Sequence, residues 1–183
     1  MSLILVLSFI IEKDINMKKI VLTAIAVLGF AFANAQEQTA KGKWLIEANT
    51  AFGAGTGNTA FSLKSQDGET DWNIGAEAGY FVMDNLAVKL GLGYGDDGNS
   101  SKFSYKVGAK YYLLDKFPLE ASYTGVSIKD VDHNPSFIGL QGGYAWFVGK
   151  NVSVEPGLRY NITTNDDYAK SFLQLNIGFA LHF

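Results

Sequence analysis

The last stretch of the chain, Phe172-Leu-Gln-Leu-Asn-Ile-Gly-Phe-Ala-Leu-His-Phe183, decides the fold. From Leu173 onward every second residue is apolar, and the residues between them are polar or small. Because the side chains of a strand point alternately to opposite faces, this period of two predicts a strand with one apolar and one polar face. In a soluble sandwich the apolar face would meet another sheet, whereas in a membrane barrel it would meet lipid.

The same alternation recurs in seven segments upstream, with no helical period between them. These segments are residues 44–52, 72–82, 86–95, 103–113, 117–125, 138–148 and 152–162. Short turns at 83–85, 114–116 and 149–151 alternate with longer links at 53–71, 96–102, 126–137 and 163–171. The pattern predicts an all-β, eight-stranded antiparallel up-and-down transmembrane β-barrel. Pro156 lies within one predicted strand and lacks a ladder donor, so we expect a local bulge there.

Residues 1–35 have the pattern of an N-terminal extension followed by a cleavable signal peptide at 17–35. Met17-Lys18-Lys19 is a basic start, the 14 residues from Ile20 to Ala33 are an apolar run, and a small-x-small cleavage site ends at Ala35. The run is shorter than the roughly 20 residues of a spanning helix, so we expect export and cleavage rather than the alternative, an uncleaved anchor. The pattern leaves open whether Met1 or Met17 is the true start.

Residues 36–183 then form the barrel domain. Their 148 residues suit one domain, and they carry 12 Lys and Arg against 16 Asp and Glu, a net charge of −4. This acidic balance gives nucleic acid no electrostatic reason to bind. The chain has no cysteine, which excludes disulfides and thiolate metal sites.

The charged residues of the predicted strands decide between lipid and water as the outer solvent. They all fall on the inward face, four of each sign: Glu47, Glu77, Glu120 and Glu155 against Lys89, Lys106, Lys110 and Arg159. A soluble carrier of the lipocalin kind, which is the alternative from another class, has the opposite arrangement, with apolar side chains inside for a ligand. An outer wall without charges favours lipid.

Aromatic residues gather near both ends of the predicted strands. The sequence predicts two interfacial girdles that include Trp44, Trp72, Tyr80, Tyr94, Tyr111, Tyr123, Trp146 and Tyr160. Amphipathic rings of this kind prefer the level of the lipid headgroups, although β-propensity alone also enriches aromatics in strands.

With its signal peptide, eight strands of about ten residues and a terminal Phe183, the chain resembles the small outer-membrane β-barrel proteins of Gram-negative bacteria. It is similar to the OmpA and OmpX barrel class and to the porin-family barrels of Bacteroidetes. The resemblance implies an outer-membrane location, contact with lipid and lipopolysaccharide, and recognition by the barrel assembly machinery. The assembly signal that it implies comprises Leu175, Ile177, Phe179, Leu181 and Phe183.

The lumen of an eight-stranded barrel is just wide enough for side chains to fill it. We therefore expect a plugged lumen with an ion-pair network, centred on Glu47, Glu77 and Glu155 with Lys89, Lys106 and Arg159, and a structural or surface-interaction role. A narrow channel for small solutes is the alternative.

No cofactor and no catalytic activity are expected from the sequence. His182 faces inward without a positioned nucleophile, and His133 lies in a loop beside Asp132. The loops carry a net charge of −5, through Asp67, Glu69, Asp71, Asp96, Asp97, Asp130, Asp132, Asp166 and Asp167 against Lys64, Lys102, Lys129 and Lys170. This acidic rim is a candidate surface for an extracellular partner, and its Asp96-Asp97-Gly98-Asn99 stretch is a possible site for a divalent cation.

Overall fold

The structure is a computed structural model that describes residues 38–52, 60–66, 69–96, 98–131, 134–167 and 169–183. The predicted signal peptide and His133 lie outside these residues and stay predictions. The strands are β1 (Trp44–Phe52), β2 (Ala60–Gln66), β3 (Glu69–Met83), β4 (Leu86–Asp96), β5 (Ser101–Leu113), β6 (Phe117–Ile128), β7 (Ser136–Gly143), β8 (Trp146–Phe147), β9 (Val152–Thr163) and β10 (Phe172–His182). No helix long and apolar enough to cross a bilayer occurs in the described part of the chain.

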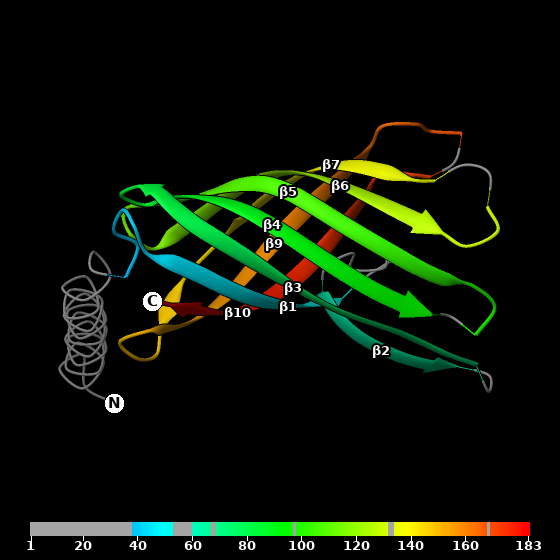
Figure 1. Cartoon of the computed structure of the whole chain (residues 1–183), viewed down its shortest axis with the longest axis horizontal. Coiled ribbons are helices and arrows are strands. Elements are labelled where there is room, and N and C mark those ends of the chain that lie inside the picture. Colours follow the sequence, from blue (N-terminus) through cyan, green and yellow to red (C-terminus); the bar gives the residue numbers. More distant parts are fainter. Residues whose placement is uncertain (1–37, 53–59, 67–68, 97, 132–133, 168) are drawn as a thin grey trace, which may run out of the picture. The chain divides into compact units, whose positions relative to one another are not determined.

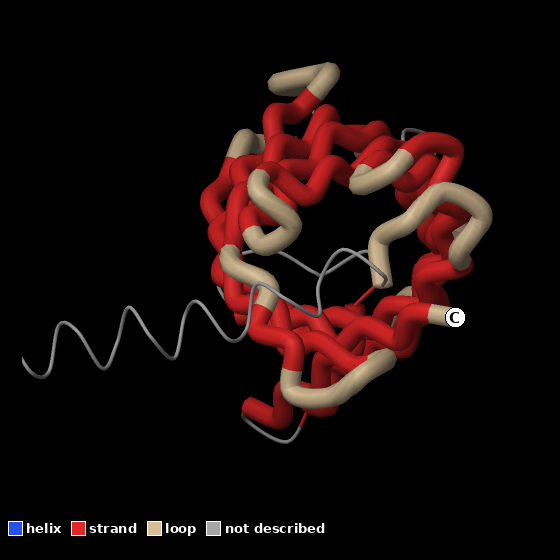
Figure 2. Tube along the Cα trace, turned by 90° about the vertical axis from the view of Figure 1, so that its left-hand side faces the viewer, coloured by secondary structure: helices blue, strands red, loops and turns tan. Residues whose placement is uncertain are grey.

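Eight of these strands close into a cylinder. Going round it, β1, β3, β4, β5, β6, β7, β9 and β10 pair antiparallel with their neighbours, and β10 returns to β1 from Leu45↔His182 to Phe52↔Leu175. The strands are joined up and down along the barrel in Figure 1 and form a ring in Figure 2. The predicted eight-stranded antiparallel barrel is confirmed.

The alternation of the sequence becomes an inside and an outside. In β4 the residues from Ala87 to Gly95 alternate strictly between buried and exposed. Leu90 on the outer face is 63% exposed, whereas its neighbour Lys89 is 1% exposed. β5, β9 and β10 alternate in the same way, β6 departs from the alternation at the buried Gly125, and β7 is half-buried from Gln141 to Gly143. The apolar side chains thus form most of the outer wall, and the charged ones line the lumen.

Residues 53–71, expected to be a loop, contain a strand that was not predicted from the sequence. β2 pairs with the beginning of β3 from Ser62↔Asn73 to Gln66↔Glu69, and it touches β1 in parallel at Asn49↔Ala60. β3 accordingly begins at Glu69, before the predicted start at Trp72. Phe61 and Leu63 alternate with polar residues, and this alternation could have indicated the strand. The alternating segment is short, however, and the residues before it are rich in glycine, which favoured the prediction of a loop.

Pro156 interrupts the ladder without producing the bulge that we expected. The register continues from Gly143↔Gly157 to Trp146↔Val154, so neither strand gains a residue. Tyr144 donates its N–H to the Pro156 carbonyl at 3.0 Å, but proline has no N–H to donate in return. The missing hydrogen bond separates β7 from β8, while the pairing of β9 with β10 runs through Ile177↔Pro156 unbroken.

Candidate functional site: the barrel lumen

Lys89 on β4 lies at the centre of the charged lumen. Its ammonium contacts three carboxylates that come from three different strands: Glu47 at 2.8 Å, Glu77 at 2.6 Å and Glu120 at 2.7 Å. All four side chains are 1% exposed. An ammonium has three N–H donors, and the three carboxylates around Lys89 match that number.

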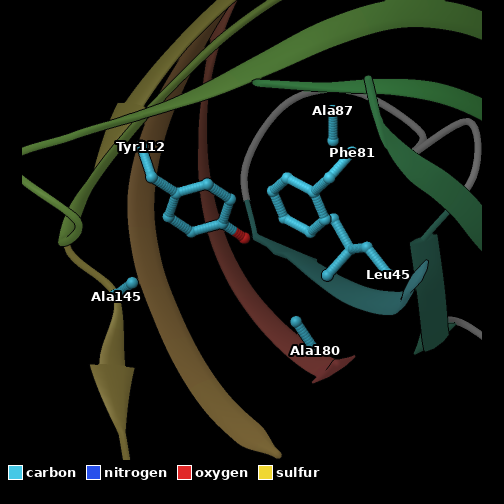
Figure 3. Close-up of a cluster of buried hydrophobic side chains, with 6 residues drawn as sticks. All are labelled: Leu45, Phe81, Ala87, Tyr112, Ala145 and Ala180. Carbon is cyan, nitrogen blue, oxygen red and sulfur yellow. The ribbon is translucent and has the colours of Figure 1, made fainter. Parts of the chain in front are cut away.

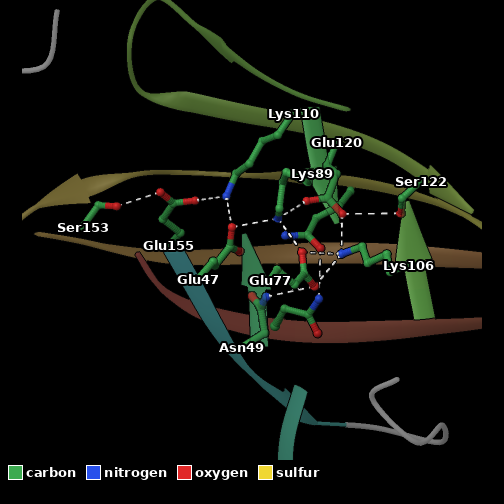
Figure 4. A network of polar contacts seen from close by, with 12 residues as sticks. Glu47, Asn49, Glu77, Lys89, Lys106, Lys110, Glu120, Ser122, Ser153 and Glu155 are labelled. Carbon is green, nitrogen blue, oxygen red and sulfur yellow. Dashed lines mark hydrogen bonds and ion pairs between the residues drawn. The ribbon is translucent and has the colours of Figure 1, made fainter. Parts of the chain in front are cut away.

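Further ion pairs extend this cluster along the barrel (Figure 4). Toward the turn end, Lys110 bonds Glu47 at 2.8 Å and also bonds Glu155. Toward the loop end, Lys106 bonds Glu77 at 2.8 Å and also bonds Glu120. Arg159 donates to Glu120 at 3.0 Å and to the Ser122 hydroxyl at 2.7 Å.

The eight charged residues predicted to line the lumen therefore lie in one connected network of four acids and four bases. From the sequence, Glu120 and Lys110 were expected outside its centre. The structure places both inside it. Glu120 contacts three bases, Lys89, Lys106 and Arg159. Lys110 joins Glu47 to Glu155. Pairing of this kind offsets the high cost of removing charges from water.

Gly139 makes the position of Arg159 possible. A Cβ at residue 139 would lie 1.8 Å from Nη2 of Arg159 and 2.3 Å from its Cζ. The guanidinium thus occupies the space that any other side chain would take. Asn161 Oδ1 accepts from Arg159 Nε at 2.8 Å and fixes the group in this place.

An apolar cluster lies inside the barrel at the turn end of the lumen (Figure 3). It comprises Leu45, Phe81, Ala87, Tyr112, Ala145 and Ala180, each at most 1% exposed, with Phe147 packed against it. Phe81 and Tyr112 were predicted on the inward face of a polar lumen, but a separate apolar layer was not predicted. Inward aromatics close to two turns were the overlooked signal. The Tyr112 hydroxyl donates to Glu155 at 2.9 Å and so connects this apolar floor to the ion pairs.

His182 lies among the rings of the floor, with centroid distances of 5.4 Å to Phe147 and 6.1 Å to Tyr112. Its Nε2 is 3.1 Å from Ser153 Oγ, and that hydroxyl donates to Glu155 at 2.7 Å. In a hydrolytic triad the carboxylate bonds the imidazole, and the serine hydroxyl bonds the base. Here the carboxylate holds the serine, which is itself 0% exposed, so the three groups lack the geometry of a nucleophilic site.

Gln38 and Thr39, which precede β1, form hydrogen bonds with two of the short turns. Asn85 donates its N–H to the Thr39 carbonyl at 2.8 Å, and the Gln38 amide donates to the Gly149 carbonyl at 3.0 Å. The Thr39 hydroxyl bonds Asn85 Oδ1 as well, and Thr39 is fully buried. Nothing in the residue pattern had indicated this contact.

Three carboxylates of the network have the spacing of a metal site. One oxygen each from Glu47, Glu77 and Glu120 lies within 4.8 Å of the others. The ammonium of Lys89 occupies the position between them, as its three contacts show. The group is therefore balanced by a cation that belongs to the chain itself.

The aromatic residues predicted to form girdles all lie on the outer wall. Trp44, Trp72, Tyr80, Tyr94, Tyr111, Tyr123, Trp146 and Tyr160 are between 38% and 61% exposed. The ring centroids of Trp44 and Tyr80 lie 5.1 Å apart at the turn end, and those of Trp72 and Tyr94 lie 5.9 Å apart at the loop end.

The residues of the predicted assembly signal lie on the outer face of the closing strand. Leu175, Phe179, Leu181 and Phe183 are exposed, and Ile177 is half-buried. Phe183 exchanges two backbone hydrogen bonds with Trp44, of 2.9 and 3.1 Å, and so completes the ring.

Asp96, which the sequence suggested as a cation ligand, stabilises the turn between β4 and β5. Its two carboxylate oxygens accept hydrogen bonds from the Gly98 N–H at 2.8 Å and from the Ser101 hydroxyl at 2.7 Å. Both oxygens thus stabilise the connection between β4 and β5.

A closed antiparallel cylinder of eight strands, apolar outside and charged inside, defines the class of transmembrane β-barrels. The chain is similar to the N-terminal β-barrel domain of OprF from Pseudomonas aeruginosa, with 12% identity and a TM-score of 0.55 over 78% of this chain and 98% of that one. Ail of Yersinia pestis in a phospholipid nanodisc gives 13% identity and a TM-score of 0.48 over 78% and 100%. OprG of Pseudomonas aeruginosa has 11% identity and a TM-score of 0.47, over 80% of this chain and 98% of OprG.

No family model and no curated protein matches the sequence. The likeness to OprF shows the fold, and the chain has the fold of the small outer-membrane β-barrels. The resemblance stated from the sequence is thereby confirmed at the level of fold. The apolar outer wall fits the lipid-facing surface that the sequence predicts.

Proposed function

We propose that this chain is an integral outer-membrane β-barrel with a plugged lumen and a structural or surface-interaction role. The observation that carries the proposal is the inversion of the usual soluble arrangement, with apolar side chains outside and paired charges inside. Leu90, Leu92 and Leu173 on the wall are each at least 60% exposed. In water such a wall would be an apolar patch far larger than the few hundred Å² usual for soluble monomers.

The same inversion argues against a lipocalin-like carrier. A carrier needs an apolar cavity, but the middle of this lumen contains Glu47, Glu77, Lys89 and Lys110, each at most 2% exposed. An apolar ligand there would have to displace ion pairs in a region of low dielectric, and it would leave buried charges unpaired.

Two layers support a plugged lumen rather than an open pore. The ion pairs join side chains from different strands (Figure 4), and the apolar floor (Figure 3) adjoins them through the hydrogen bond from Tyr112 to Glu155. Each side chain in the centre of either layer is nearly or fully buried, as expected of a lumen that bulk solvent does not enter.

Planar-bilayer recording tests the plugged lumen. Purified barrel inserted into a bilayer is expected to give no steady conductance, while a porin in the same preparation gives open channels. Steady channels from the wild-type chain would refute the plug. Fractionation tests the location separately, since a heat-modifiable band in outer membranes is expected and a soluble periplasmic protein would contradict it.

The partners remain part of the proposal. The apolar outer face of β10, which is followed by Phe183, would be accessible to the barrel assembly machinery before β10 pairs with β1 and closes the ring. The acidic rim, of which Asp130, Asp166 and Asp167 are exposed, would meet a basic partner directly or lipopolysaccharide phosphates through shared divalent ions. Thermal stability that is unchanged by calcium, magnesium or EDTA would dismiss specific cation binding at the rim.

A further inference from the structure

Three buried acceptor oxygens on the lumen faces of β1 and β10 lack a hydrogen-bond donor among the described residues. They are Glu47 Oε1, Asn49 Oδ1 and Asn176 Oδ1. The three residues are 1%, 5% and 5% exposed. A buried acceptor without a donor costs about 1–3 kcal/mol, and more when it is charged, so a barrel whose other lumen charges are so fully bonded is expected to supply donors here as well.

Two of these oxygens converge in front of Gly178, which pairs with Asn49 across the β1–β10 ladder. A Cβ at residue 178 would lie 2.9 Å from Asn49 Oδ1 and 3.1 Å from Glu47 Oε1. The two oxygens are therefore no more than about 6 Å apart. One donor group between them can reach both, because two O–H···O hydrogen bonds of up to about 3.0 Å span up to about 6 Å.

The charges around this point favour a neutral donor over a cation. The other oxygen of Glu47 already accepts from Lys89 and Lys110, both at 2.8 Å. A further cation on Oε1 would repel these two ammonium groups, and the network already balances its four acids with four bases. A water molecule donates two hydrogen bonds and adds no charge.

A reversed Asn49 amide does not satisfy the site equally well. In the present orientation Asn49 Nδ2 donates to Glu77 Oε1 at 3.5 Å. Exchanging nitrogen and oxygen would place an acceptor against the Glu77 carboxylate, so one unsatisfied contact would replace another.

We propose that the lumen binds an ordered water in front of Gly178, which donates one hydrogen bond to Glu47 Oε1 and the other to Asn49 Oδ1. The water completes the bonding of the glutamate that joins Lys89 to Lys110. The glycine is required because any side chain would occupy the place of the water. This inference rests on the barrel fold and the lumen contacts, and it holds or fails independently of the proposed cellular role.

A high-resolution crystal structure of the whole barrel, grown in rubidium chloride, tests the proposal. The expected result is a density peak within hydrogen-bond distance of both oxygens and without anomalous signal. An anomalous peak would identify an alkali cation and overturn the proposal. Density for a protein donor at this place, a reversed Asn49 amide bonded to Glu47, or no peak at all would overturn it equally.

The variant Gly178→Ala provides a second test, with Gly142→Ala as its matched control. Both are glycines of the barrel wall, but a Cβ at residue 142 meets only Leu119 Cδ2, at an ordinary 3.6 Å. We expect the peak to be lost in Gly178→Ala and kept in Gly142→Ala. A peak that persists unchanged in Gly178→Ala would contradict the role given to the glycine, and if that variant does not fold, the wild-type map alone decides.

Discussion

Replacing Lys89 by methionine removes the cation on which three lumen carboxylates converge. The side chain keeps its length, but Glu47, Glu77 and Glu120 each lose a contact of 2.6–2.8 Å in a site that is 1% exposed. The charge of the lumen network changes from zero to −1. Removing one partner of a buried ion pair costs about 3–5 kcal/mol, and Lys106, Lys110 and Arg159 remain to limit the loss to that range.

The assay is urea unfolding of the barrel in lipid vesicles, followed by tryptophan fluorescence. Lys102→Met is the control, because Lys102 makes a longer ion pair, with Asp71 at 3.2 Å, and although the Lys102 side chain is 10% exposed, that of Asp71 is 33% exposed. This rim pair is expected to contribute about 0–1 kcal/mol. If Lys89→Met and Lys102→Met lose the same small amount, the reasoning that the lumen pairs are strongly coupled is wrong.

The same site allows a rescue experiment. In Lys89→Ala the three carboxylate oxygens, which lie within 4.8 Å of one another, are left without their central cation. Two calcium–oxygen distances of about 2.4 Å span about 4.8 Å, so calcium is expected to raise the unfolding midpoint of Lys89→Ala and to leave the wild type unchanged. An equal response of both proteins would place the calcium effect elsewhere.

Three further variants test other parts of the barrel. Gly139→Ala is expected to cost about 1–3 kcal/mol by overpacking, because its Cβ would displace the Arg159 guanidinium; an unchanged urea midpoint would contradict this. Deleting Phe183 is expected to reduce the amount of barrel in outer membranes several-fold while a refolded sample keeps most of its stability, and equal losses in both would refute a role in assembly. Thr39→Val removes the hydroxyl bond to the turn at residue 85 and is expected to cost about 1 kcal/mol. The same unfolding assay compares it with Thr163→Val, whose hydroxyl at the end of β9 bonds Asn165 in the exposed connection that follows.

The inside and outside of the barrel were predictable from the sequence because a period of two assigns every residue of a strand to one face. Lys89 and Leu90 show how sharp this assignment is, since one is buried among carboxylates and the other lies on the wall. The closure of the ring was predictable for a related reason. Eight strands whose outer faces are all apolar must leave no unpaired edge in a bilayer, where no water is present to bond it.

The partners within the lumen were not predictable in the same way. Lys89 on β4 meets Glu47 on β1 and Glu120 on β6, which are 42 and 31 residues away in sequence. Such contacts across the barrel depend on the stagger of the strands, which an alternating pattern does not specify. The contact of Gln38 and Thr39 with the turns was hidden for another reason, since it is made largely through backbone carbonyls that have no sequence signature.

The division of the lumen into a charged and an apolar layer bears directly on permeation. The charged layer is contributed by β1, β3, β4, β5, β6 and β9, so that opening it requires several ion pairs on different strands to break together. An ion that passed this layer would next meet the floor of Leu45, Phe81 and Tyr112, where no charged partner replaces its hydration among the described floor residues. An apolar solute would be stopped one layer earlier, by charges that it cannot solvate. Because the two layers would reject opposite kinds of solute, the plug that we propose would not open through a movement of side chains in one layer alone.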